Sequence, residues 1–214
     1  MGGDGCIYGI PQNANGVLKI NPITDHVEIL AVGILGDGQW KWHGGLASND
    51  GLKIFGFPNN SDEFLVIDTL DGRVYTIGVF TVLNSGRHRH YKKAEAGMPV
   101  LDHRYKYLGG ASTADGKYVY LFPCDAERVL RIDVENDSIQ TVGPLLLEGE
   151  NKYQNGFCGR DGCLYGIPQR AAGILRIIPP SSSNEEEHVD TIYCGDDMVG
   201  LKDKCEGGVL GPTD

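Results

Sequence analysis

The chain has 214 residues, and its 19 Lys and Arg residues against 29 Asp and Glu residues give a formal charge of −10. Such an acidic protein repels phosphate groups, which excludes general adhesion to nucleic acid or to anionic lipid. The composition, 41% hydrophobic and 22% charged, is typical of a globular domain. The sequence has no apolar stretch near the ~20 residues of a membrane span and no signal-peptide pattern at its start. We therefore expect a soluble intracellular protein.

The first predicted feature is a repeat that occurs four times along the chain. Residues 4–11 and 161–168 match almost residue for residue, and residues 50–58 and 115–123 carry the same pattern with one inserted residue. The Asp-Gly pair that opens each copy recurs after 46, 65 and 46 residues. Each copy continues with a leucine and an isoleucine at fixed distances from its proline: Leu18 and Ile20, Leu65 and Ile67, Leu130 and Ile132, Leu175 and Ile177.

Each copy predicts four short strands. In the second copy these are residues 41–47, 53–57, 64–68 and 73–77, separated by turn residues such as Asp50-Gly51. Four-stranded units that repeat every ~40–50 residues are typical of a β-propeller, because a sheet that is apolar on both faces must lie between neighbours. The sequence predicts an all-β propeller of four blades, each with four antiparallel strands. The predicted core between blades contains Ile7, Leu18, Ile20, Ile54, Leu65, Ile67, Val119, Leu130 and Ile132.

A second motif, Lys-x-x-[Gly/Asn]-Gly, marks the first strand of each unit and starts at Lys41, Lys106, Lys152 and Lys204. The first unit lacks this strand, so we expect the C-terminal strand to join the N-terminal blade and close the ring. The single domain then has blades at about 1–40 plus 204–214, 41–78, 106–143 and 152–203, with an insertion at about 79–105. A closed ring predicts a monomer. The alternative is a fragment of a larger propeller.

The repeat resembles the propeller repeats of the NHL, YVTN and streptogramin-lyase-like kind. Their units also run from a Gly-rich strand through Asp-Gly and an apolar-aromatic strand to an Ile-Asp strand, here Gly44-Gly45, Asp50-Gly51, Ile54-Phe55 and Ile67-Asp68. The resemblance covers nearly the whole chain apart from the insertion. It implies an architecture and carries no activity with it, because one fold hosts many functions.

The four lysines of the second motif form the first candidate site. If Lys41, Lys106, Lys152 and Lys204 lie at one height in the ring, they gather positive charge that could hold a phosphate or carboxylate near the tunnel. The alternative is that they lie at solvated strand starts and merely follow the duplication. The double glycines beside them are expected to allow close packing of the inner strands.

The insertion carries the second candidate site. Its basic run includes Arg87, Arg89, Tyr91, Lys92 and Lys93 and could bind an acidic or phosphate-bearing partner. The alternative is a solvated surface loop. A metal site at two histidines of this run is weaker, since no carboxylate or cysteine lies at a ligand spacing. We expect no metal and no cofactor, and a protein or a small anionic ligand as the partner.

Catalytic motifs such as Gly-x-Ser-x-Gly, His-Glu-x-x-His or a P-loop are absent from the sequence. His43 and Glu206 stand at equivalent inner-strand positions and could form an acid–base pair near the tunnel if the ring closes. The sequence favours a non-enzymatic binding or assembly scaffold that acts through the tunnel mouth and the basic insertion. The alternative is a propeller hydrolase or lyase that uses His43 and Glu206. The six cysteines are expected to be buried thiols, with a disulfide framework as the alternative.

Overall fold

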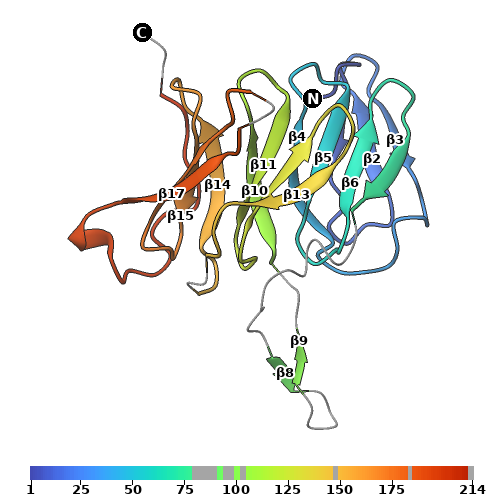
Figure 1. Ribbon diagram of the computed structural model, residues 1–214. Helices are drawn as coiled ribbons and strands as arrows, with labels where there is room; N and C mark the ends of the chain where they lie inside the picture. Colours follow the sequence, from blue (N-terminus) through green and yellow to red (C-terminus); the bar gives the residue numbers. More distant parts are fainter. Residues whose placement is uncertain (79–90, 94–98, 102–104, 147–148, 183–184, 212–214) are drawn as a thin grey trace.

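The computed structural model describes residues 1–78, 91–93, 99–101, 105–146, 149–182 and 185–211, the two short segments by their backbone alone. Four antiparallel sheets, here called blades 1 to 4, follow one another in chain order from one end of the molecule to the other (Figure 1). Their strands are β1 (Ile7–Gly9), β2 (Val17–Asn21) and β3 (His26–Leu30) in blade 1; β4 (Trp42–Ala47), β5 (Lys53–Pro58), β6 (Phe64–Asp68) and β7 (Val74–Ile77) in blade 2; β10 (Tyr107–Ser112), β11 (Tyr118–Pro123), β12 (Val129–Asp133) and β13 (Ile139–Val142) in blade 3; and β14 (Tyr153–Cys158), β15 (Leu164–Pro168), β16 (Gly173–Ile178) and β17 (His188–Tyr193) in blade 4.

The all-β class predicted from the repeat is confirmed. The four strands predicted for the second copy agree with β4 to β7 within one residue at each end. A short 3-10 helix, η1 (Asp196–Met198), is the one helical element in the described part of the chain. No helix among the described residues has the length and apolar character to cross a membrane. All six cysteines are free thiols, as expected, but only Cys6 and Cys124 of the six are buried.

The Asp-Gly pairs form the turns between the first and second strands. The Oδ1 atom of Asp50 accepts a hydrogen bond from the Leu52 N–H at 3.0 Å, and Asp115 accepts one from the Lys117 N–H at the same distance. Gly51 and Gly116 follow with φ angles of 72° and 73°, a conformation that glycine adopts without a steric penalty. The turn chemistry visible in the sequence therefore fixes where each hairpin reverses.

Each pair of neighbouring blades encloses its own apolar core. Tyr8, Ile10 and Leu30 of blade 1 pack against Trp42 and Leu65 of blade 2. The other two cores lie between blades 2 and 3 and between blades 3 and 4, and each of them buries several phenylalanine and tyrosine side chains. The repeated leucines and isoleucines of blades 2, 3 and 4 lie in these cores, as predicted.

The motif lysines join each blade to the one before it. The backbone N–H of each of these four lysines donates a hydrogen bond to a carbonyl oxygen of the preceding blade. The acceptor is always the residue that follows the repeat's proline. The pairs are Lys41 with Gln12 at 2.9 Å, Lys106 with Asn59 at 3.1 Å, Lys152 with Cys124 at 3.0 Å and Lys204 with Gln169 at 2.8 Å. The second motif therefore specifies the docking of successive units.

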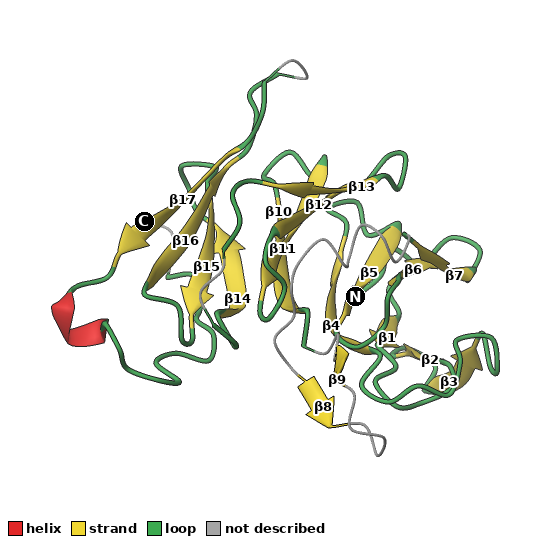
Figure 2. Ribbon diagram, turned by 60° about the horizontal axis from the view of Figure 1, so that its bottom comes forward, coloured by secondary structure: helices red, strands yellow, loops and turns green. Residues whose placement is uncertain are grey.

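The predicted closure of the ring by the C-terminal strand is not found. Blade 1 has three strands instead of four, and residues 204–211 form no strand. The bond from Lys204 to Gln169 holds the tail on blade 4, while β1 lies at the other end of the row (Figure 2). As a result, Ile7 and Leu18, both predicted to be core residues, are 46% and 38% exposed.

Candidate functional site

Three of the four motif lysines are buried and bind carbonyl oxygens. Lys41, Lys106 and Lys152 are 5%, 0% and 2% exposed, so the alternative that they stand at solvated strand starts is wrong for these three. Lys41 Nζ donates to Ala14 O at 2.8 Å and to Gly38 O at 3.1 Å. Burial lowers the pKa of Lys41 and of Lys152, because removal from water disfavours the charged ammonium.

The same arrangement recurs in the other blades. Lys106 Nζ donates to Asn60 O at 3.2 Å and to Asp62 Oδ1 at 3.3 Å, and Lys152 Nζ donates to Gly149 O at 3.3 Å. Lys204 is more exposed, and its Nζ donates to Leu201 O at 2.8 Å. Lys41, Lys152 and Lys204 therefore each bind a carbonyl oxygen three residues earlier in the chain, whereas Lys106 binds the β5–β6 loop of the preceding blade. A shared anion at the four lysines remains a prediction.

The basic insertion is the second predicted site. Arg87 and Arg89 lie outside the described residues, and of Tyr91, Lys92 and Lys93 the structure describes only the backbone. These three residues form β8 (Tyr91–Lys93), which pairs with β9 (Pro99–Leu101) in a separate two-stranded sheet. Binding of an acidic partner at this run remains a prediction.

The structure does not bring His43 and Glu206 together. No hydrogen bond or ion pair joins the two residues, both of which lie in the described part of the chain. Glu206 Oε1 instead accepts from Gln154 Nε2 at 3.4 Å, the equivalent side chain in blade 4. His43 Nδ1 is buried and has no hydrogen-bond partner. Two blades separate the positions along the open row, which is why the predicted acid–base pair is not formed.

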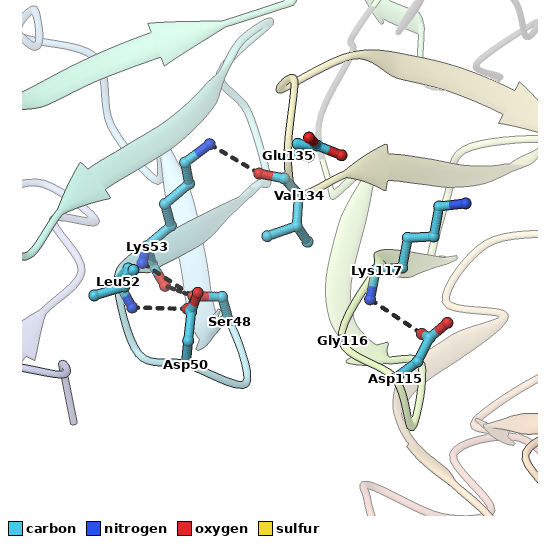
Figure 3. A pocket seen from close by; sticks show the side chains of 9 residues that line it. All are labelled: Ser48, Asp50, Leu52, Lys53, Asp115, Gly116, Lys117, Val134 and Glu135. Carbon is cyan, nitrogen blue, oxygen red and sulfur yellow. Dashed lines mark hydrogen bonds between the residues drawn. The ribbon is translucent and has the colours of Figure 1, made fainter.

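A cleft of about 390 Å³ lies between blades 2 and 3 and was not predicted from the sequence (Figure 3). Its walls are the Asp-Gly turns of the two blades and the end of β12, with the lining residues Ser48, Asp50, Leu52, Lys53, Asp115, Gly116, Lys117, Val134 and Glu135. Both turns carry a lysine shortly after the Asp-Gly pair. The sequence contains that signal, but only the stacking of the blades makes the two turns face each other.

The two aspartates of this cleft form hydrogen bonds within their own turns. Hydrogen bonds from the Ser48 hydroxyl and the Leu52 N–H lower the pKa of Asp50, and bonds from Thr113 and Lys117 lower the pKa of Asp115. Lys53 Nζ is 2.6 Å from Asp137 Oδ1 and 2.8 Å from Val134 O. Carboxylates with lowered pKa values stay ionised and are poor proton donors at neutral pH. The cleft thus suits binding of a polar group better than acid–base chemistry.

The outward face of blade 1 is the largest departure from the predicted core. In the register of the sheet, Ile7 pairs with Ile20 and Ile20 with Val27, while Leu18 pairs with Ile29. Paired residues share a face, and so do residues two apart on one strand. These side chains therefore form one apolar surface, and Val27 and Ile29 are 55% and 56% exposed.

The corresponding residues of the other blades are buried. The positions equivalent to Ile7, Leu18 and Ile20 are at most 6% exposed in blades 2, 3 and 4: Ile54, Leu65 and Ile67; Val119, Leu130 and Ile132; Leu164, Leu175 and Ile177. In blades 2, 3 and 4 this face packs against the preceding blade. Blade 1 presents the same face, named here the blade 1 face (Ile7, Leu18, Ile20, Val27 and Ile29), and among the described residues no other blade lies on it.

Comparisons with known proteins support the architecture. No family model and no curated protein matches the chain. Among solved structures, a streptogramin B lyase matches with a TM-score of 0.57 at 11% identity, covering 88% of this chain and 52% of the lyase. A catalytically inactive virginiamycin B lyase from Staphylococcus aureus with quinupristin matches with a TM-score of 0.55 at 14% identity, covering 85% of this chain and 50% of the lyase. The dihydro-heme d1 dehydrogenase NirN matches with a TM-score of 0.55 at 11% identity, covering 88% of this chain and 35% of the dehydrogenase.

The chain spans about half the length of the two lyases that it matches. At such identities the likeness extends to the fold and not to the activity. It agrees with the four-fold repeat, with the stacked antiparallel blades and with the resemblance noted in the sequence. The chain is a β-propeller repeat protein whose blades are similar in fold to those of the streptogramin lyases.

Proposed function

We propose that this chain is a non-enzymatic binding and assembly module of the propeller type, which acts through the blade 1 face. The observation that carries the proposal is the exposure of a surface whose equivalents are buried in every other blade. Contiguous apolar patches of this kind on soluble proteins mark interaction sites. The face is already ordered as a sheet, so a partner binds it without first having to organise it.

The basic run at 87–93 belongs to the same proposal as a further contact surface. The run is the densest positive segment of a chain with a net charge of −10. It would attract an acidic or phosphate-bearing partner, and this attraction would weaken as salt is added. Deletion of residues 87–93 separates this contribution from that of the blade 1 face.

A propeller hydrolase or lyase is the second candidate. The observation in its favour is the buried Nδ1 atom of His43, which has no partner and could accept or donate a proton. An enzyme of this kind would lose its activity in a His43→Ala variant. The assembly module would still bind peptides on the blade 1 face in the same variant, because His43 is not part of that face.

The experiment that tests the proposal is a selection of short random peptides against the chain, immobilised at low density. Peptides that bind the wild-type chain should lose binding to a V27E/I29E double variant, which places charge on the blade 1 face. The matched control is Leu70→Glu, which introduces one carboxylate at an apolar residue that is 75% exposed on a turn of blade 2. Selected peptides that bind all three proteins equally would contradict the proposal.

A further inference from the structure

The C-terminal tail (residues 204–211) and blade 1 are complementary parts of one blade. In blade 2, the inner strand β4 begins at the Lys-x-x-Gly-Gly motif and pairs with β5. Residues 204–208 carry the same motif and dock on blade 4 through the same backbone bond, from Lys204 to Gln169. In the part of the chain that the structure describes, the tail therefore carries the motif of an inner strand but pairs with no sheet, while β1 to β3 form a sheet that has no inner strand.

The contacts of the tail agree with this comparison. A Cβ atom added to Gly45 of β4 would lie 3.1 Å from Ile10 of the preceding blade. A Cβ atom added to Gly208 would lie 3.8 Å from Ile167, which occupies the position of Ile10 in blade 4. The tail thus lies against blade 4 much as β4 lies against blade 1.

The outward face of blade 4 has nearly the same chemistry as the face of blade 1 that packs on blade 2. In blade 1 a tyrosine, a cation and a carboxylate lie side by side across three strands: Tyr8, Lys19 and Glu28. In blade 4 the same three places hold Tyr165, Arg176 and Asp190. The tyrosines also match in detail, because Tyr8 donates to Asp4 at 2.8 Å and Tyr165 donates to Asp161 at 2.6 Å.

This likeness indicates what the outward face of blade 4 can accept. Its counterpart in blade 1 packs against Ile54, Leu65 and Ile67 of blade 2. The blade 1 face offers Ile7, Leu18 and Ile20 at the equivalent positions. The last blade of one molecule is therefore complementary to the first blade of another.

We propose that a second copy of this chain covers the blade 1 face, with residues 204–211 of that copy forming the missing inner strand beside β1. This inference rests on the proposed assembly function and names its partner. The register of blade 2, where Gly45, Leu46 and Ala47 pair with Gly56, Phe55 and Ile54, transfers directly. It pairs Gly208 with Gly9, Val209 with Tyr8 and Leu210 with Ile7.

In a dimer with a twofold axis, the tail of each copy pairs with β1 of the other copy, so both blade 1 faces are covered. A head-to-tail contact closes into a ring when its rotation divides a full turn. The chain covers 52% and 50% of the two lyases, so two rows of four blades suffice for one ring of eight, within the usual range of propellers.

The buried area is large enough for a stable dimer. Strands about 4.8 Å apart that rise about 3.3 Å per residue give a four-stranded, five-residue blade a footprint of roughly 300 Å². Two contacts with two faces each therefore bury roughly 1,200 Å², the lower end of stable complexes.

The second copy also gives His43 a partner. Gln154 and Glu206 occupy the same position in successive inner strands and are in contact at 3.4 Å. In the two-copy ring the tail of one molecule precedes β4 of the other, so Glu206 stands next to His43 of the second copy. Its carboxylate can then bind the buried Nδ1 atom that has no partner in the single chain.

Sedimentation velocity of the purified chain tests the inference. The wild-type chain should sediment with twice the mass of 23.2 kDa. A V27E/I29E variant and a Val209→Asp variant should each sediment as 23.2 kDa, because either change would bury an unpaired carboxylate in the ring and weaken dimerisation roughly a hundredfold or more. Val209 is 90% exposed in the single chain, so the variant should fold normally, which circular dichroism verifies. The matched control is Ile23→Asp, at a residue that is also 90% exposed, and it should remain dimeric.

Mixing the two monomeric variants tests the head-to-tail geometry. V27E/I29E retains an intact tail and V209D retains an intact blade 1 face, so the mixture should form a dimer through one intact contact, more weakly than the wild-type chain, at concentrations where neither variant associates alone. A wild-type chain that remains at 23.2 kDa, or a dimer that survives both changes, would overturn the inference. If the wild-type chain is monomeric while its blade 1 face still binds selected peptides, the assembly function stands and only the second copy is refuted.

Discussion

Gly109→Ala tests whether the inner strands are as crowded as the double glycines indicate. A Cβ atom at Gly109 would lie 2.7 Å from the Cα atom of Asn155 in the inner strand of blade 4 and 3.1 Å from its backbone N. Real Cβ contacts do not reach 2.7 Å, and a backbone atom in a paired strand cannot turn aside as a side chain can. The two blades must therefore move apart to accept one methyl group.

The expected cost is that of overpacking, about 1–3 kcal/mol, reduced by the ~0.4–1 kcal/mol gained when alanine restricts the unfolded chain. A net loss of about 1–2 kcal/mol lowers the melting temperature by roughly 2–8 °C in a chain of this size. Calorimetry of the variant measures this shift. Gly38→Ala is the control, because its Cβ would meet only the side chain of Lys41, at 3.4 Å from Cγ and 3.7 Å from Cδ, which are ordinary contacts. If Gly109→Ala is as stable as the control, the explanation of the double glycines by close packing is wrong.

Two further predictions concern charged groups. Lys106→Met removes an ammonium that is fully buried and bound to Asn60 O and Asp62, so it should cost about 2–4 kcal/mol in urea unfolding. Lys204→Met, at the exposed equivalent, should cost less than about 1 kcal/mol, and equal losses would refute a stabilising role for the buried lysine. Burial raises the pKa of Asp4, but hydrogen bonds from the Cys6 N–H, Tyr8 and Lys19 outweigh it and lower the pKa to about 2. The stability that Asp4 contributes is present above pH 3.8 and is lost as the pH falls through about 2. Because solvent screens this exposed carboxylate, Asp4→Asn should cost no more than about 1 kcal/mol at pH 7. The difference from the wild-type chain should narrow between pH 4 and pH 2, and a constant difference would contradict the lowered pKa.

Much of the fold follows from local sequence chemistry. Asp50-Gly51 and Asp115-Gly116 specify their turns through bonds that span two residues, and Leu65 and Ile67 alternate with the pleat of their strand. These signals depend on the nearest neighbours in the chain. Because they recur four times, they identify the blade and the order of its strands.

The ends of the row could not be predicted in the same way. Ile7 and Leu18 repeat the pattern of Ile54 and Leu65, so the sequence assigns all four to a core. The pattern specifies that a face is apolar, but it does not specify which sheet covers it. Because the units are duplicated, the terminal blade has the same apolar residues as the blades that are covered on both faces.

At the candidate site, too, the local pattern could be predicted from the sequence and the long-range contacts could not. The register of the motif lysines was visible in the sequence, but their burial against carbonyl oxygens depends on connections such as Asn60 and Gly149, which the motif does not include. The cleft between blades 2 and 3 joins residues more than sixty positions apart. His43 and Glu206 were paired on the assumption of a ring closed within one chain, and the open row separates them.

Hydrogen exchange at β1 tests the central claim that blade 1 is a docking site. In the single chain, β1 pairs with β2 on one side only, and its other edge is free within the described residues. If a second inner strand adds to this edge, the amide protons of Ile7 to Gly9 and the residues facing them should exchange more slowly as the protein concentration rises. Equal exchange rates at all concentrations, with the amides of β5 protected throughout, would contradict the account.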